Sequence, residues 1–218
     1  MNKKQKILLL VGISLILLFI LWTVLLTFVD VANVGPLNSR VGLSSVNSAF
    51  HRLTGVNVQL YAVTDWLGLL PIGIALGFAF LGLVQLIKRR SLIKVDKSIL
   101  LLGGFYLAMI IIFVFFEKVI INYRPVLIEG VLEASYPSST TLLFTTVMPT
   151  AAIDLSTRIK SKSAKSVCVL LILSVSTFCV FGRALSGVHW ITDIIGGLLI
   201  GAGVDLVYCS LHDLIKKS

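Results

Sequence analysis

Six long apolar runs follow one another along the 218-residue chain, and they limit its possible folds more than any other feature. The first extends from Ile7 to Val29 and makes a helix of about 34 Å, which is enough to cross a bilayer. The others cover roughly residues 61–87, 99–116, 140–155, 167–184 and 190–211. These runs predict an all-α polytopic membrane protein, built as a six-transmembrane-helix bundle.

The composition excludes the main alternative classes. Hydrophobic residues make up 57% of the chain, charged residues only 13%, and the mean hydropathy is +1.00. A soluble domain of this size has too little interior to hide so much apolar surface, whereas a lipid bilayer can cover it. The net charge of +9 could suggest a nucleic-acid partner. The basic residues, however, lie in short clusters between apolar runs, as in loops that flank membrane helices.

We expect residues 1–218 to form one membrane-embedded domain. The first run has neither the short apolar core nor the small-residue cleavage site of a signal peptide, so it is expected to remain as a membrane anchor. The three cysteines lie inside apolar runs without ligand spacing, so neither a disulfide nor a metal site is expected at Cys168, Cys179 and Cys209. Two GxxxG pairs, Gly73/Gly77 and Gly197/Gly201, favour close contacts between helices.

The distribution of basic residues predicts the orientation in the membrane. Three precede the first run, five follow the second, four follow the fourth and two follow the sixth, so fourteen of the 19 Lys and Arg residues share one side. Because positive charge accumulates on the cytoplasmic side, both termini are expected there, in a multi-pass protein of the cell membrane. The loops that begin at Asp30, Glu117 and Leu185 then face outward.

Those outward loops contain an unusual set of polar residues. The first segment, Glu117 to Pro125, ends the third run, and the second, Tyr136 to Thr141, opens the fourth. The third, Arg183 to Asp193, joins the fifth run to the sixth. Charges at the edge of a bilayer are costly and by default indicate a functional site. The motif-bearing part of the chain is therefore residues 117–193.

The residue types in these segments indicate phosphate chemistry. Two arginines and a lysine are suited to phosphoryl oxygens, namely Arg124, Arg183 and Lys118. Hydroxyls and free backbone N–H groups at a helix start bind anions, which predicts contacts from Ser138, Ser139 and Thr140.

His189 and Asp193 are one helical turn apart, so the carboxylate can hold one imidazole nitrogen while the other attacks phosphorus. No acidic cluster suited to Mg²⁺ accompanies them, so no metal and no cofactor are expected.

These segments resemble the type-2 phosphatidic acid phosphatase superfamily, the membrane branch of the acid phosphatase and vanadium haloperoxidase fold. The family pattern is K-x6-R-P, P-S-G-H and S-R-x5-H-x3-D. Arg183, His189 and Asp193 match the third part, although Gly182 replaces its serine. Arg124-Pro125 and Pro137-Ser138 match the ends of the first two parts. The resemblance extends from Trp66 over the rest of the chain.

Two departures from the family pattern bear on the chemistry. Glu117 stands where the family has its lysine, and Lys118 is one place late, which turns a helical side chain by about 100°. Thr140 stands where the family has the histidine that protonates the leaving group. An alternative acid is His51 in the first outward loop, although an exposed loop histidine is the simpler interpretation. Asp65-Trp66 is expected to cap a helix at the membrane interface.

The sequence therefore predicts a metal-independent lipid phosphatase at the extracytoplasmic face, with a phosphohistidine formed on His189. Its substrate is expected to be a lipid phosphate or diphosphate that enters from the bilayer. A polyprenyl diphosphate best suits the absent acid, since a phosphate leaving group needs no proton. The alternative is a non-catalytic protein of the same fold that binds or transports phospholipid headgroups.

The predicted orientation can be tested by cysteine labelling in a variant that lacks the three native cysteines. Arg40→Cys is expected to react with an impermeant reagent added outside the cell, because the first loop faces outward. Leu92→Cys is expected to react only after the membrane is permeabilised. Labelling of Leu92→Cys in intact cells would reverse the topology.

Overall fold

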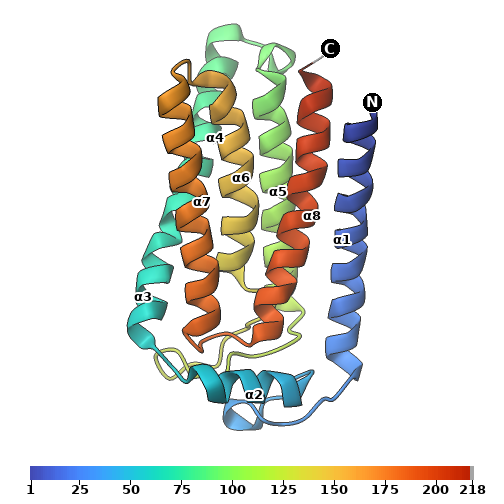
Figure 1. The fold of residues 1–218 in the computed structure, drawn as a ribbon, viewed down its shortest axis with the longest axis vertical. Helices are drawn as coiled ribbons and strands as arrows, with labels where there is room; N and C mark the ends of the chain where they lie inside the picture. The colour runs from blue at the N-terminus through green and yellow to red at the C-terminus, as the bar shows by residue number, and fades with distance from the viewer. Residues whose placement is uncertain (217–218) are drawn as a thin grey trace.

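The computed structural model describes residues 1–216, and these form a bundle of long helices that are roughly parallel or antiparallel (Figure 1). The bundle consists of α1 (Lys3–Phe28), α4 (Leu69–Arg89), α5 (Lys97–Lys118), α6 (Ser139–Arg158), α7 (Lys162–Leu185) and α8 (Ile191–Ile215). The shorter helix α3 (Val58–Leu67) continues α4 at an angle. No β-strand occurs in this part of the chain, so the all-α prediction is confirmed.

Five of these segments are long and apolar enough to cross a membrane: Lys3–Phe28, Val58–Arg89, Lys97–Lys118, Lys162–Leu185 and Ile191–Ile215. Their outward side chains are large and apolar, as Leu10 and Leu17 of α1 illustrate, with 65% and 60% of their surfaces exposed. A surface of this kind is stable in lipid rather than in water. The chain is therefore a multi-pass membrane protein.

Helix α6 corresponds to the fourth apolar run and has the most enclosed position in the bundle. It packs against α8, α7 and α4, and more than half of its residues are buried. Five threonines between positions 140 and 150 make it less apolar than the other long helices. Four of their hydroxyls find partners within the chain, for example through bonds from Thr145 and Thr150 to carbonyls of the preceding turn, whereas the Thr146 hydroxyl is buried without a partner among the described residues. Pro149 also lies inside this helix.

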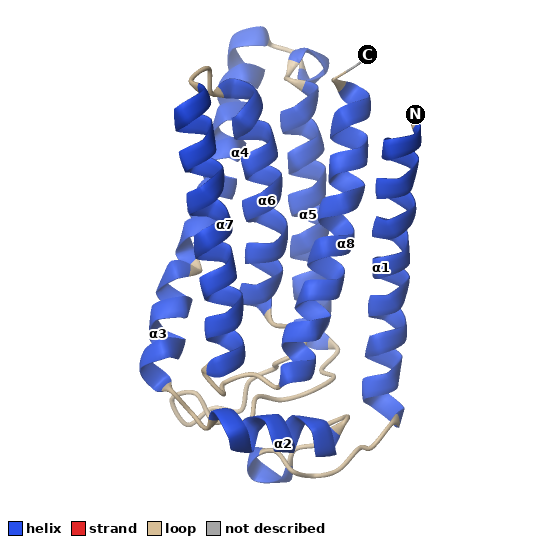
Figure 2. Cartoon of the chain, viewed as in Figure 1, coloured by secondary structure: helices blue, strands red, loops and turns tan. Residues whose placement is uncertain are grey.

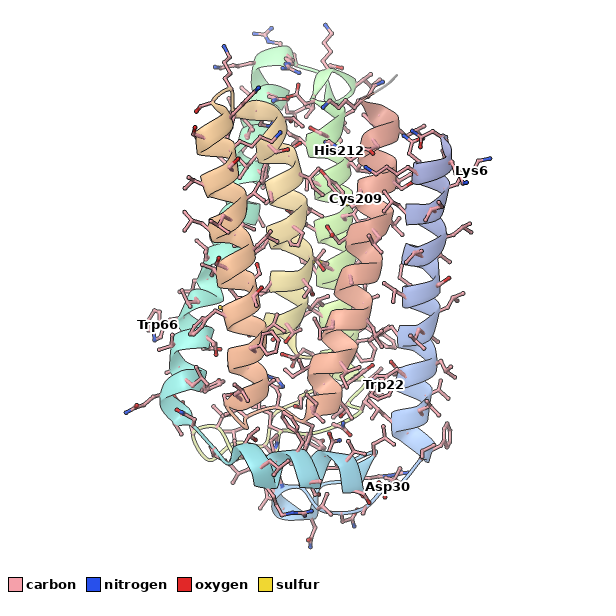
Figure 3. The ribbon with its side chains drawn as sticks, in the orientation of Figure 1. Lys6, Trp22, Asp30, Trp66, Cys209 and His212 are labelled. Atoms are coloured by element: carbon pink, nitrogen blue, oxygen red, sulfur yellow. The ribbon has the colours of Figure 1, made fainter. Side chains whose placement is uncertain are left out.

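The second apolar run is divided into two helices, where the sequence predicts one. The chain turns at Gly68, where a Cβ atom would lie 2.8 Å from the carbonyl oxygen of Asp65. Helix α3 therefore leans against α7 near the end of the bundle. Trp66 points outward from it and is 74% exposed (Figure 3), as expected of an interfacial aromatic residue.

The loops divide between the two ends of the bundle (Figure 2). The longer loops, 29–57, 119–138 and 186–190, gather at one end, and a further helix that the sequence did not predict, α2 (Ser44–Thr54), lies across it. The chain ends lie at the opposite end (Figure 1), where Figure 3 shows Lys6 and His212. The structure thus brings the three polar segments to the same end.

Close packing between α6 and α8 depends on Gly197 and Gly201. A Cβ atom at Gly201 would lie 1.9 Å from the Thr145 hydroxyl, and one at Gly197 would lie 2.9 Å from Cβ of Thr141. At Gly73 and Gly77 of α4, by contrast, no atom comes within 4 Å of the added carbon. Of the two GxxxG pairs, only the one in α8 makes a close helix contact.

This difference predicts the effect of adding a methyl group at each site. We expect Gly201→Ala to reduce the free energy of unfolding by about 1–3 kcal/mol, because α8 must move away from Thr145. The matched control, Gly77→Ala, is expected to leave stability unchanged or slightly raised, since alanine favours helix and the site is open. Thermal unfolding in detergent compares the two. Equal losses would show that the α6–α8 contact is not close.

Candidate functional site

Asp193 is completely buried at the start of α8, and its carboxylate accepts three hydrogen bonds. The backbone N–H of Trp190 donates to Oδ2 over 3.0 Å, which caps the helix, and Nδ2 of Asn122 donates to Oδ1 over 3.2 Å. The hydroxyl of Ser135 also donates to Oδ2. An acidic residue in the first turn is further stabilised by the helix dipole. The loops before α6 and α8 are thus fixed to one carboxylate.

His189 lies beside this carboxylate but does not bond to it directly. Its Nδ1 is 3.8 Å from Oδ2 of Asp193, longer than a hydrogen bond. Nδ1 instead lies 3.1 Å from the Ser135 hydroxyl. The sequence predicted a direct pair from the one-turn spacing, but His189 precedes the first residue of α8, so helical spacing does not apply to it. Ser135 occupies the space between them.

Nε2 of His189 is buried and has no hydrogen-bond partner within residues 1–216. The side chain forms part of the wall of a small cavity of about 30 Å³. Burial, reinforced by the positive charges of Arg124 and Arg183, lowers the pKa of His189 from 6.5 to about 4, although Asp193 acts in the opposite direction. The imidazole is therefore neutral near pH 7, and Nε2 can react as a nucleophile.

The same cavity combines polar and apolar walls. Its polar wall includes Arg124, Ser135 and Ser139, and its apolar wall includes the partly exposed Phe113 of α5. Glu117 also lines it, at the position of the family lysine. Lys118, which was predicted to bind phosphate, is exposed at the end of α5 and does not line the cavity, because its one-residue shift turns the side chain away.

Arg183 is buried in the last turn of α7 and is held on several sides. Its Nη2 donates to Asp65 over 2.5 Å and to the Thr140 hydroxyl over 2.6 Å. The guanidinium also lies 4.6 Å from the centre of the Tyr61 ring, while its Nε and Nη1 are buried without partners in the described chain. Asp65 was expected to cap a helix, but it forms an ion pair with this buried arginine. Thr140 is a ligand of Arg183.

Arg124 also lies near Tyr61. Its guanidinium is 5.8 Å from the ring centre, and its Nε lies 3.0 Å from Glu133. Nη1 is buried and has no partner among the described residues. Both arginines therefore face the same aromatic ring and keep nitrogen atoms available, although each is also paired with a carboxylate. Such pairing is expected, because an unpaired buried cation is costly.

Gly182, where the family has serine, allows α3 to approach. A Cβ atom there would lie 2.6 Å from Cγ2 of Thr64. This contact brings Tyr61 and Asp65 of α3 to Arg183. The contact of Tyr61 and Asp65 with Arg183 was not predictable from the sequence, because the two residues lie more than a hundred positions before Arg183 in the chain.

Two other predicted residues have structural partners. Ser138 is the N-cap of α6, where its hydroxyl accepts the backbone N–H of Thr141 over 3.4 Å. His51 of α2 has Nε2 3.1 Å from the carbonyl oxygen of Gly187, and its ring packs against Trp190. It does not line the cavity.

Neither Ser135 nor Asn122 was expected, because isolated loop residues of these types carry no distinguishing pattern.

Comparison with known proteins is consistent with this geometry. A sequence profile described as the PAP2 superfamily matches residues 104–216, about half of the chain. The chain belongs to the PAP2 superfamily. This assignment confirms the resemblance inferred from the three motifs and supports a phosphatase in general. Among curated proteins, no sequence gives a significant match.

One solved structure shares the fold of this PAP2 protein. It is the crystal structure of a transmembrane PAP2-type phosphatidylglycerolphosphate phosphatase from Bacillus subtilis. The two align with a TM-score of 0.55 and 19% sequence identity, over 94% of this chain and 98% of the other. At this identity the similarity establishes the membrane PAP2 fold, while residue roles depend on the geometry described above.

The environment of His189 predicts its titration. We expect its imidazole to remain neutral between pH 5 and 8 and to gain a proton only as the pH falls toward 4, because the pKa is lowered by burial. The chain has three histidines, so His51→Gln and His212→Gln variants identify the signal in ¹⁵N-histidine NMR. Protonation of His189 near pH 6.5 would contradict the buried, cation-flanked site.

Proposed function

We propose that this protein is a metal-independent phosphatase of lipid phosphates or diphosphates, with His189 as its nucleophile. The observation that carries this proposal is the unpartnered Nε2 of a buried, neutral histidine at a cavity that Arg124 also lines. Arg183, whose guanidinium lies 4.6 Å from the centre of the Tyr61 ring, adds a second positive charge. Such fixed cations stabilise the charge that develops during phosphoryl transfer.

The reaction has two steps. The Nε2 lone pair attacks phosphorus, an N–P bond forms, and the P–O bond to the leaving group breaks with its electron pair on oxygen. Water then attacks phosphorus, the N–P bond returns its electrons to Nε2, and inorganic phosphate leaves with the water oxygen. The proton of the attacking water passes to phosphate or solvent. Asp193 offsets the positive charge on the imidazole of the phosphohistidine.

A diphosphate, such as a polyprenyl diphosphate, is the substrate that best suits position 140. The Thr140 hydroxyl accepts a bond from Arg183 and cannot supply a proton near neutral pH as a histidine would. An alkoxide leaving group needs that proton, whereas a phosphate leaving group does not. The partly exposed Phe113 on the cavity wall is suited to a lipid chain approaching from the bilayer.

We further propose that the chain crosses the membrane six times, and that α6 is a span in addition to the five long apolar segments. Helix α6 is less apolar than the others because they largely enclose it, and it need not face lipid. The end that carries α2 and His189 then faces the outside of the cell membrane, and both termini are cytoplasmic. The distribution of basic residues supports this orientation.

A second candidate function is non-catalytic binding or transport of phospholipid headgroups. Three carboxylates favour it. Glu117 stands in place of the family lysine, Glu133 pairs with Arg124, and Asp65 pairs with Arg183. These carboxylates reduce the positive charge available to a phosphate. A binding protein would retain lipid without releasing phosphate.

Phosphate release from purified protein in mixed micelles tests the function. We expect the protein to hydrolyse a polyprenyl diphosphate up to about 10²–10⁴-fold faster than phosphatidic acid. This activity is expected to persist in EDTA and to be blocked by vanadate. His189→Ala, shown to be folded, is expected to abolish it. Activity that depends on added Mg²⁺ would contradict the mechanism, and the absence of turnover would favour the binding protein. Equal rates on both substrates would indicate another proton donor, with Glu117 the first to test.

A further inference from the structure

Ser135 lies between the nucleophile and its carboxylate, and only one arrangement of protons satisfies all three side chains. It is 4% exposed, so no solvent replaces its bonds. Its hydroxyl has one proton to donate and contacts two groups, Nδ1 of His189 over 3.1 Å and Oδ2 of Asp193. Which group receives the proton decides the tautomer of His189.

The surroundings of Asp193 settle this choice. Its Oδ2 also accepts the backbone N–H of Trp190, and its Oδ1 accepts an N–H of Asn122. Both oxygens are therefore acceptors, and the hydroxyl proton of Ser135 must point to Oδ2. The Ser135 oxygen can then only accept, so Nδ1 of His189 carries the ring proton. Nε2 is left with its lone pair, on the side of the imidazole that has no partner in the described chain.

We propose that Ser135 is a positioning residue that fixes the reactive tautomer of His189 and connects it to Asp193 in a His189–Ser135–Asp193 relay. This inference rests on the proposed function and adds to it a residue that none of the three motifs contains. When Nε2 bonds to phosphorus, the Nδ1 proton becomes more acidic and its bond to Ser135 strengthens. The Ser135 hydroxyl in turn is polarised by the ionised Asp193, so the serine transmits the stabilisation.

The backbone around Ser135 holds it in this position. Its N–H donates to the carbonyl oxygen of Asn122 over 2.9 Å, and the Asn122 side-chain oxygen accepts the N–H of Gly42 over 3.1 Å. Asn122 is completely buried and also donates to Asp193. The relay is thus attached on both sides to buried groups, which limits movement of the hydroxyl.

The relay predicts specific kinetics for Ser135→Ala. We expect kcat to fall by about 10–100-fold with KM nearly unchanged, since the serine acts on the nucleophile and not on substrate binding. Asp193→Asn is expected to lower kcat by a smaller factor in the Ser135→Ala background than in the unmodified protein, because the part of its effect that passes through the serine is already lost. Ser135→Cys keeps a weak hydrogen-bond donor, so its kcat should lie between that of the unmodified protein and that of Ser135→Ala. Ser210→Ala is the matched control, since it removes another buried serine hydroxyl, which is bonded to the Gln5 carbonyl in the first turn of α1 and does not line the cavity.

A second measurement decides the relay independently of activity. The ¹⁵N shifts of His189 at pH 7 should show Nδ1 protonated in the unmodified protein and in Ser210→Ala, and a mixture of tautomers in Ser135→Ala. Unchanged tautomer and kcat in a folded Ser135→Ala protein would overturn the relay, as would full additivity of Ser135→Ala and Asp193→Asn. If neither substrate is hydrolysed, the proposed function fails, but the tautomer measurement still supports or overturns the role of Ser135.

Discussion

The buried carboxylate of Asp193 is the group on which the arrangement of the site depends. A charge with no exposed surface must be fully hydrogen-bonded, and here the donors come from Trp190, Asn122 and Ser135. These donors lie in two different loops, and Asn122 continues the connection to Gly42 in a third. One carboxylate therefore aligns three loops that meet at the same end of the bundle. Removing it would leave several buried donors without an acceptor.

The positive part of the site is arranged by a different element. Helix α3 leans on α7 because Gly182 leaves space for Thr64, and this contact places Tyr61 near both arginines and Asp65 on Arg183. The family pattern has a serine at that position. Gly182 and the ion pair of Asp65 with Arg183 are thus physically linked, since the second requires α3 to come close. The result is a pair of arginines that are held firmly but are partly neutralised by carboxylates.

Much of the molecule was predictable from the sequence because it follows from local chemistry. Long apolar runs require helices in lipid, where every backbone N–H and C=O must be paired within the segment. The motif residues Arg124, Arg183, His189 and Asp193 were identified from residue type and spacing, and the PAP2 assignment confirms the family. Lys118 was predicted to bind phosphate but does not line the cavity, because its one-residue shift from the family position rotates the side chain away.

The tertiary structure decided which residues complete those motifs. Ser135 between His189 and Asp193, Asn122 beside them, and Tyr61 and Asp65 around Arg183 come from segments that are distant in sequence or have ordinary loop composition. Helix α2 and the break at Gly68 were missed because short elements at the end of a bundle are set by packing and not by hydropathy. The sequence by itself determined the membrane helices and the phosphate chemistry, since both depend on residue type and period. The proton arrangement around His189 depends on contacts a few ångströms long between remote residues, so only the folded chain defines it.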